Sequence, residues 1–173
     1  MLNFPAEAAG RPNDTHNMYV VCVAIPPFDG STGVLPVGEH EAGWDEIQLR
    51  FGWNPRRRQL LDGLAEGLTI LAGAGCTKVW LNGSFVTAKD EPGDFDAVWS
   101  PTGVDRNVLA GAGPELLDLR DHRDAQKARF GGEFLPNVTE AGSGKEFADF
   151  FQSDRDGTPK GIVAIDPTKE IWT

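Results

Sequence analysis

Two short groups of residues in the middle of the chain have the types and the spacing needed to bind a metal ion and a phosphate. Gly83 and Ser84 come first, nine residues follow, and Asp94 and Asp96 then flank Phe95. Because alternate residues of a strand point to the same face of a sheet, the two aspartates should project together while Phe95 enters the core. Two neighbouring carboxylates repel each other, and Mg²⁺, which binds carboxylates together with phosphate oxygens, is their natural partner.

Gly83 and Ser84 supply the other half of such a site. Gly83 has no Cβ, so the backbone can approach a ligand closely, and Ser84 offers a hydroxyl and an amide to a phosphate. The free N–H groups of a helical turn after Ser84 would add affinity for an anion. Each residue also has an ordinary structural interpretation, with Asp94 in a turn, Asp96 facing solvent on an edge strand and Ser84 capping a helix.

The whole pattern resembles the signature of the nucleotidyltransferase superfamily, whose best-known member is DNA polymerase beta. That signature joins a hydrophobic residue, Gly, Gly or Ser, a short gap, and a segment of Asp, a hydrophobic residue and Asp or Glu. Leu81, Gly83–Ser84 and the segment Asp94-Phe95-Asp96-Ala97 occupy these places. The wider stretch 33–165 looks like a group of small bacterial proteins of this superfamily, most closely at residues 76–99.

The resemblance implies a minimal nucleotidyltransferase fold, which is an α/β (α+β) domain with a short mixed sheet and packed helices. It implies that Asp94 and Asp96 bind Mg²⁺, as two ions that Mn²⁺ can replace, and that Gly83 and Ser84 hold the triphosphate of an NTP. The superfamily usually adds a third carboxylate on a neighbouring strand. Glu133 is our first choice for this catalytic and metal-binding role, and Asp118 is the alternative.

The activity implied is the transfer of a nucleoside monophosphate from an NTP to a hydroxyl of a protein, a small molecule or RNA. Small members of the superfamily occur in toxin–antitoxin and defence systems, which suggests that context here. The alternative is a catalytically inactive regulator or antitoxin-like binding protein with the same fold, and an unrelated α/β binding domain with a coincidental motif is a third interpretation. A short chain leaves little room for an acceptor domain, so we expect a protein partner or a homo-oligomer.

Basic residues near the motif are candidates for contact with the nucleotide. A helix at 55–72, capped by Asn54, should run antiparallel to a strand at 78–82, which brings its start beside Gly83 and Ser84. Arg56 and Arg57 lie at that start, where the helix dipole disfavours cations. Contact with a phosphate would explain why Arg56 and Arg57 stand at this position. The alternative, which we weight equally, is a solvated cluster of charges without a ligand. Lys89, in the loop between the motif halves, carries the same two interpretations. Lys160 is a candidate because Pro-Lys160-Gly-Ile resembles a segment that recurs in the group.

The rest of the chain predicts the elements that position these residues. An arm at 1–27 contains a strand at 19–25, and a single domain follows at 28–173, beginning with a loop-like stretch to residue 43. Residues 116–119 form either a short strand or the start of a helix. The other expected elements are helices at 44–51, 55–72, 123–130 and 145–152 and strands at 78–82, 95–99, 133–135 and 162–165.

Composition limits the class of protein. The 173 residues correspond to one domain, and 26 acidic against 16 basic residues give a net charge of -10, which argues against extended nucleic-acid binding. The apolar run at 18–25 is too short to cross a membrane and no signal peptide is evident, so we expect a cytoplasmic protein. Two cysteines and three histidines show no disulfide framework and no zinc spacing.

Overall fold

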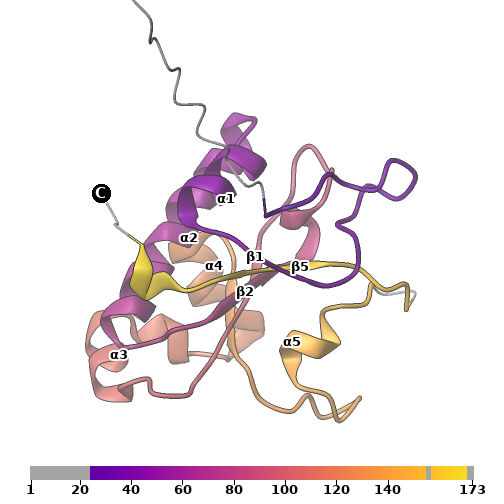
Figure 1. Ribbon diagram of the computed structural model, residues 1–173. Coiled ribbons are helices and arrows are strands. Elements are labelled where there is room, and N and C mark those ends of the chain that lie inside the picture. The colour runs from indigo at the N-terminus through magenta and orange to yellow at the C-terminus, as the bar shows by residue number, and fades with distance from the viewer. Residues whose placement is uncertain (1–23, 155–156, 171–173) are drawn as a thin grey trace, which may run out of the picture.

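The computed structural model describes residues 24–154 and 157–170, and it contains a five-stranded mixed sheet with helices against it (Figure 1). This confirms the expected α+β class. The spatial order of the strands is β1 (Glu39–Glu41), β5 (Ile162–Ile165), β2 (Val79–Asn82), β3 (Asp96–Trp99) and β4 (Glu133–Pro136). The pairs β1–β5 and β3–β4 are parallel, whereas β2 is antiparallel to both of its neighbours.

The strands at 78–82, 95–99, 133–135 and 162–165 are confirmed to within a residue at each end, but the loop expected at 28–43 is wrong at β1. The segment Glu39-His40-Glu41 lies at the edge of the sheet and carries no apolar alternation. Its extended backbone is determined by pairing with β5, which no local pattern reveals. The strand expected at 19–25 falls mostly outside the described residues, and Ala24 and Ile25 are not in a strand.

The helices α1 (Trp44–Phe51), α2 (Pro55–Gly73) and α4 (Asp124–Phe130) agree with the sequence. α5 (Phe147–Phe150) is shorter than the helix expected at 145–152. Residues 116–119, expected to be a strand or the start of a helix, overlap a 3₁₀ turn at Pro114–Leu117. α3 (Arg106–Ala112) was not predicted, because Leu109 is its only buried residue and no apolar stripe marks it. Among the described residues, no helix combines the length and apolarity needed to span a membrane.

The two faces of the sheet differ. Leu81, Ala97 and Phe134 are paired across β2, β3 and β4 and face α2, where Phe134 packs on Gly67. Residues 137–153 cross the opposite face and include α5, which lies on the other side of the sheet from α2 (Figure 1). The Asn82 amide anchors this segment by donating to the carbonyl of Phe151 at 2.7 Å.

Gly63 gives a test of the packing between α2 and α4. A Cβ added to Gly63 would collide with the backbone carbonyl of Phe130, whereas a Cβ at Gly73 meets no atom within 4 Å. Because backbone rather than a flexible side chain must move, we expect Gly63→Ala to lower the free energy of unfolding by about 2–3 kcal/mol.

The matched variant Gly73→Ala should leave stability unchanged or raise it by about 0.5 kcal/mol, because alanine restricts the unfolded chain. Urea denaturation of both variants checks the prediction. Equal stabilities for the two would contradict this contact between α2 and α4.

Candidate active site

Three polar residues form a row across the end of the sheet, on the face that points away from α2. Asn82 pairs with Asp96 across β2 and β3, and Asp96 pairs with Glu133 across β3 and β4. Residues in register on neighbouring strands project from the same face, so the three side chains stand side by side. Asp94 precedes Asp96 by two residues, and Phe95 between them is fully buried. The burial of Phe95 was expected, whereas Asp94 lies just before β3 and not on the strand.

Gly83 is required at the end of this row for a steric reason. Its φ of +74° is left-handed, and a Cβ there would collide with the carboxylate of Asp96. Glycine alone combines that backbone with so close an approach. Ser84 follows in a 3₁₀ turn at Gly83–Val86, and its carbonyl accepts a hydrogen bond from the Thr87 hydroxyl at 2.7 Å.

The carboxylate of Asp96 lies in an unfavourable environment for a negative charge. Burial, followed by the charges of Asp94 and Glu133, raises its pKa from 3.8 to about 6, and Lys160 and Arg123 offset part of this. A carboxylate that is costly to ionise, beside two others, is a common feature of sites that bind cations or move protons.

The donor set fits a divalent cation that brings part of its own coordination shell. Within residues 24–154 and 157–170, no three His, Cys, Asp or Glu side chains converge closely enough to hold a metal ion by themselves. Asp94 and Asp96 suffice as protein ligands for Mg²⁺, which binds one or two carboxylates and completes its coordination shell with phosphate oxygens and water. The buried Oδ1 of Asn82 has no hydrogen-bond partner among the described residues, and such atoms usually bind water or a ligand.

Glu133, the proposed third carboxylate, lies in the row but is already ion-paired. Its side chain is 7% exposed, and it contacts Nε of Arg123 and Nζ of Lys127 at 2.6 Å each. Sequence reasoning missed both cations, because Arg123 precedes α4 and Lys127 lies within it, and no local pattern places either beside β4. Asp118, the alternative, instead binds Arg120 at 2.7 Å and lines a separate hollow.

The structure corrects the nucleotide-binding role expected for Arg57. The start of α2 does lie beside the loop after Ser84, as predicted, but Arg57 is fully buried. Its guanidinium stacks on the Trp53 ring at 3.5 Å, and burial lowers its pKa to about 10. Its donors contact backbone carbonyls of Phe51, Phe85, Thr87, Lys89 and Asp90. Because every donor faces protein, Arg57 holds the loop in place and is not available to a nucleotide.

The other basic candidates divide into two groups. Arg56 donates to the carbonyls of Pro92 and Gly93, just before Asp94, and Lys89 is exposed on the loop. Lys160 is half-buried at the start of β5, where burial lowers its pKa and the charges of Asp96 and Asp154 raise it. Lys160 therefore belongs to the carboxylate row, whereas Arg56 shapes the chain leading into it.

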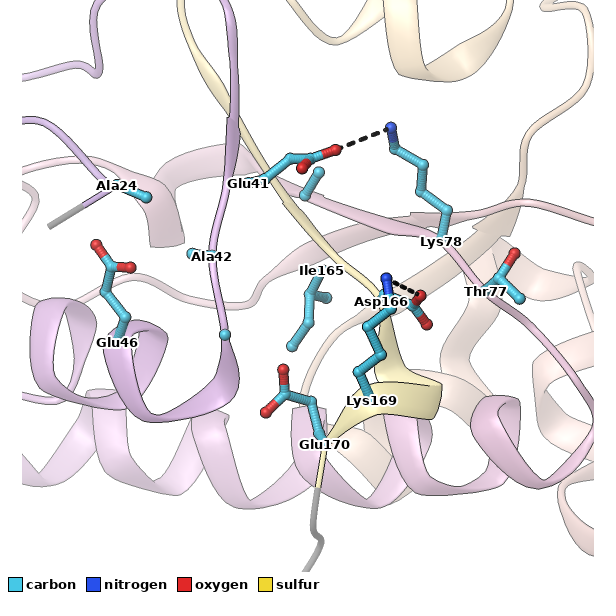
Figure 2. Close-up of a pocket in the computed structure, with 12 residues that line it drawn as sticks. Ala24, Glu41, Ala42, Glu46, Thr77, Lys78, Ile165, Asp166, Lys169 and Glu170 are labelled. Atoms are coloured by element: carbon cyan, nitrogen blue, oxygen red, sulfur yellow. Dashed lines mark ion pairs between the residues drawn. The ribbon is translucent and has the colours of Figure 1, made fainter. Parts of the chain in front are cut away.

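Two hollows lie near the sheet. One, of about 520 Å³, lies between α2 and α4, and both Asp94 and Lys127 form part of its wall. The other, of about 420 Å³, lies at the opposite end of the sheet, where Glu41 faces Lys78 and Asp166 faces Lys169 (Figure 2). None of the residues expected to do chemistry lines this second cavity, so the sequence motif and the first hollow mark the same end of the molecule.

Comparison with known proteins gives one match. A family model described as "Family of unknown function (DUF6932)" matches residues 26–166. No curated protein and no solved structure matches the chain.

Arg57 gives a test of the buried contact beneath the site. Lysine keeps the positive charge but has three donors on one atom and cannot span the carbonyls that a planar guanidinium reaches. We expect Arg57→Lys to lower the free energy of unfolding by about 3 kcal/mol.

Arg58→Lys is the matched control, because Arg58 is exposed and its side chain donates to the Gly52 carbonyl; it should change stability by less than about 0.5 kcal/mol. Urea denaturation of both variants measures the difference. A loss no larger than that of the control would contradict the structural role of Arg57.

Asp96 gives a test of the electrostatics of the row. Its folded-state pKa of about 6 lies above the ordinary 3.8, so the folded protein binds this proton more tightly and loses stability as pH rises from about 4 to 7. In buffer free of divalent metal, Asp96→Asn should therefore raise the free energy of unfolding at pH 7.5 by about 2 kcal/mol. The gain should disappear at pH 3.5, where both states carry the proton.

Asp118→Asn should have the opposite effect, because hydrogen bonds to Arg120 lower the pKa of Asp118 to about 2. Denaturation at a series of pH values measures both variants. A destabilised Asp96→Asn at pH 7.5 would contradict the electrostatic environment described for the row.

Proposed function

The chain belongs to the DUF6932 family of unknown function, and we propose that it is a Mg²⁺-dependent nucleotidyltransferase. It would move a nucleoside monophosphate from an NTP to a hydroxyl of a protein, a small molecule or RNA. The observation that carries the proposal is the register that places Asp96 beside Glu133, with Asp94 two residues earlier and Gly83 against the Asp96 carboxylate. This arrangement supports the resemblance to the minimal nucleotidyltransferase fold.

The residues of the chain have separate roles in the proposed reaction. Asp94 and Asp96 hold the metal ions, which would neutralise charge on the polyphosphate and orient the attacking oxygen when bound. Glu133 accepts the proton of the acceptor hydroxyl, because it ends the row on the side away from Gly83. Ser84 donates from its hydroxyl to a phosphate oxygen, and Gly83 leaves room for the Asp96 carboxylate against the backbone.

The acceptor reaches the row through the hollow between α2 and α4. Asp94 and Lys127 line this hollow, and Lys127 is ion-paired with Glu133 of the row, so an acceptor hydroxyl bound there would lie beside residues that contact the row. The net charge of -10 disfavours long nucleic acids, which leaves a small molecule, a protein partner or a second copy of the chain as the better acceptors. The reaction requires NTP and Mg²⁺, and both abound in the cytoplasm, where a toxin–antitoxin or defence role would also operate.

One observation favours a second function. The two ion pairs of Glu133 occupy the carboxylate that the reaction needs as a base. If they persist in the nucleotide complex, the protein is a catalytically inactive regulator that binds nucleotide or acts through a partner surface.

Label transfer distinguishes the enzyme from the regulator. The purified chain is mixed with Mg²⁺, each NTP labelled at the α-phosphate, and cell extract, and label is followed into protein, RNA and small molecules. We expect transfer that falls by at least about 100-fold in Asp94→Asn and in Asp96→Asn, because each loses a metal ligand.

Asp118→Asn is the matched control, since it makes the same change outside the row, and it should transfer at the rate of the unmodified chain. Nucleotide binding without transfer would support the regulator. The absence of both nucleotide binding and label transfer would overturn the proposed nucleotidyltransferase activity.

A further inference from the structure

We propose that Arg123 and Lys127 form a phosphate-binding pair, and that the carboxylate of Glu133 occupies this pair until a phosphate group replaces it. The inference rests on the proposed function, which it deepens by naming the residues that take the phosphate and the internal group that competes with it. No sequence motif indicated these two cations, and the arginines that the sequence did indicate point elsewhere.

The exposed fractions of the three side chains would allow a ligand from solvent to reach the two cations. Glu133 is 7% exposed, whereas Arg123 is 30% and Lys127 37% exposed. The two cations therefore form an outer layer over a buried carboxylate, and a ligand arriving from solvent meets them first. Lys127 also forms part of the wall of the hollow between α2 and α4, so this member of the pair is reached from a concave surface.

The backbone that presents Arg123 is strained. Asp121, His122 and Arg123 have φ values of 46°, 54° and 62°, so three successive residues other than glycine adopt the left-handed conformation. Each costs about 1 kcal/mol or more in this conformation. The described contacts of the turn are few, and the strongest is the ion pair of Arg123 with Glu133. Such strain is typical of binding and catalytic sites, where it presents a side chain to a ligand.

Charge balance identifies the ligand class. The carboxylates of Asp94, Asp96 and Glu133 interact with one another and with three cations, Arg123, Lys127 and Lys160. Asp154 also acts on Lys160, so four carboxylates face three cations, and a divalent cation on the carboxylates changes the net charge from -1 to +1. A phosphate restores the balance, because it ligates Mg²⁺ and accepts charge-assisted hydrogen bonds from a guanidinium and an ammonium.

The exchange gives Glu133 two states without any change of fold. In the free protein it neutralises Arg123 and Lys127 and is shielded by them. With phosphate bound, both cations turn to the phosphate oxygens and the carboxylate is released toward the row. No covalent bond is broken, and a metal ion held by the aspartates would be the new partner of the released carboxylate.

The test measures the binding of inorganic triphosphate to the full chain by titration calorimetry, in EDTA at pH 7.5 and constant ionic strength. Glu133→Gln removes the competing carboxylate, so we expect it to bind triphosphate about tenfold more tightly. Arg123→Gln and Lys127→Gln should each bind about tenfold more weakly.

Matched controls come from charges outside the row. Arg120→Gln removes a neighbouring exposed cation that binds Asp118, and Glu115→Gln removes an acid that binds Arg129. Both should leave the affinity for triphosphate unchanged. If Glu133→Gln does not fold, Glu133→Asp replaces it, because the shorter side chain loosens both ion pairs and should also raise the affinity.

Two further titrations identify the source of the phosphate. Tighter binding of triphosphate than of adenosine monophosphate assigns the pair to the NTP, whereas equal binding assigns it to a phosphorylated acceptor. Unchanged or weaker binding of triphosphate by a folded Glu133 variant would overturn the proposal and leave the ion pairs with a structural role. Because these titrations contain no metal and measure no transfer, they can fail while label transfer succeeds, and the reverse.

Discussion

The candidate site depends on one buried cation. The loop after Ser84 turns away from the sheet, so the carbonyls of Phe85, Thr87 and Lys89 have no neighbouring strand to bind them. The guanidinium of Arg57 binds all three, at 2.6 to 2.8 Å, from a position that is fully buried. Unsatisfied carbonyls in the interior would each cost about 1–3 kcal/mol, and only arginine carries enough donors in one plane to satisfy this set. The start of α2 thereby determines where the two halves of the motif meet.

The electrostatics of the row are costly for the fold and useful for function. Asp96 lies between Asn82 and Glu133 in register, where burial and two neighbouring carboxylates oppose its ionisation. A fold selected for stability alone would place an amide or an apolar residue there. Arg123, Lys127 and Lys160 compensate part of the charge without removing it. The net charge of -10 therefore includes the carboxylates of the proposed cation site, and it does not exclude a nucleotide whose phosphates arrive with Mg²⁺.

Much of the fold and half of the site could be predicted because they follow from local patterns. Asn54 accepts from the backbone N–H of Arg57 as an N-cap should, and the strands β2 and β3 begin and end near the expected residues. The burial of Phe95 between Asp94 and Asp96 was likewise expected from the local pattern. α3 and β1 were missed because they carry no local pattern. α3 has a single buried residue, and β1 is extended because it pairs with β5.

The sequence by itself determined the two halves of the motif, the strands that bear them and the glycine that the close approach of Asp96 requires. Only the tertiary structure decided which cations serve the carboxylates. Sequence proximity favoured Arg56 and Arg57, yet both donate to backbone carbonyls, whereas Arg123, Lys127 and Lys160 reach the row from distant segments. An ion pair depends on the distance between two side chains in space. That distance is determined by the register of β3 with β4 and the packing of α4 on α2, which involve residues far apart in the chain.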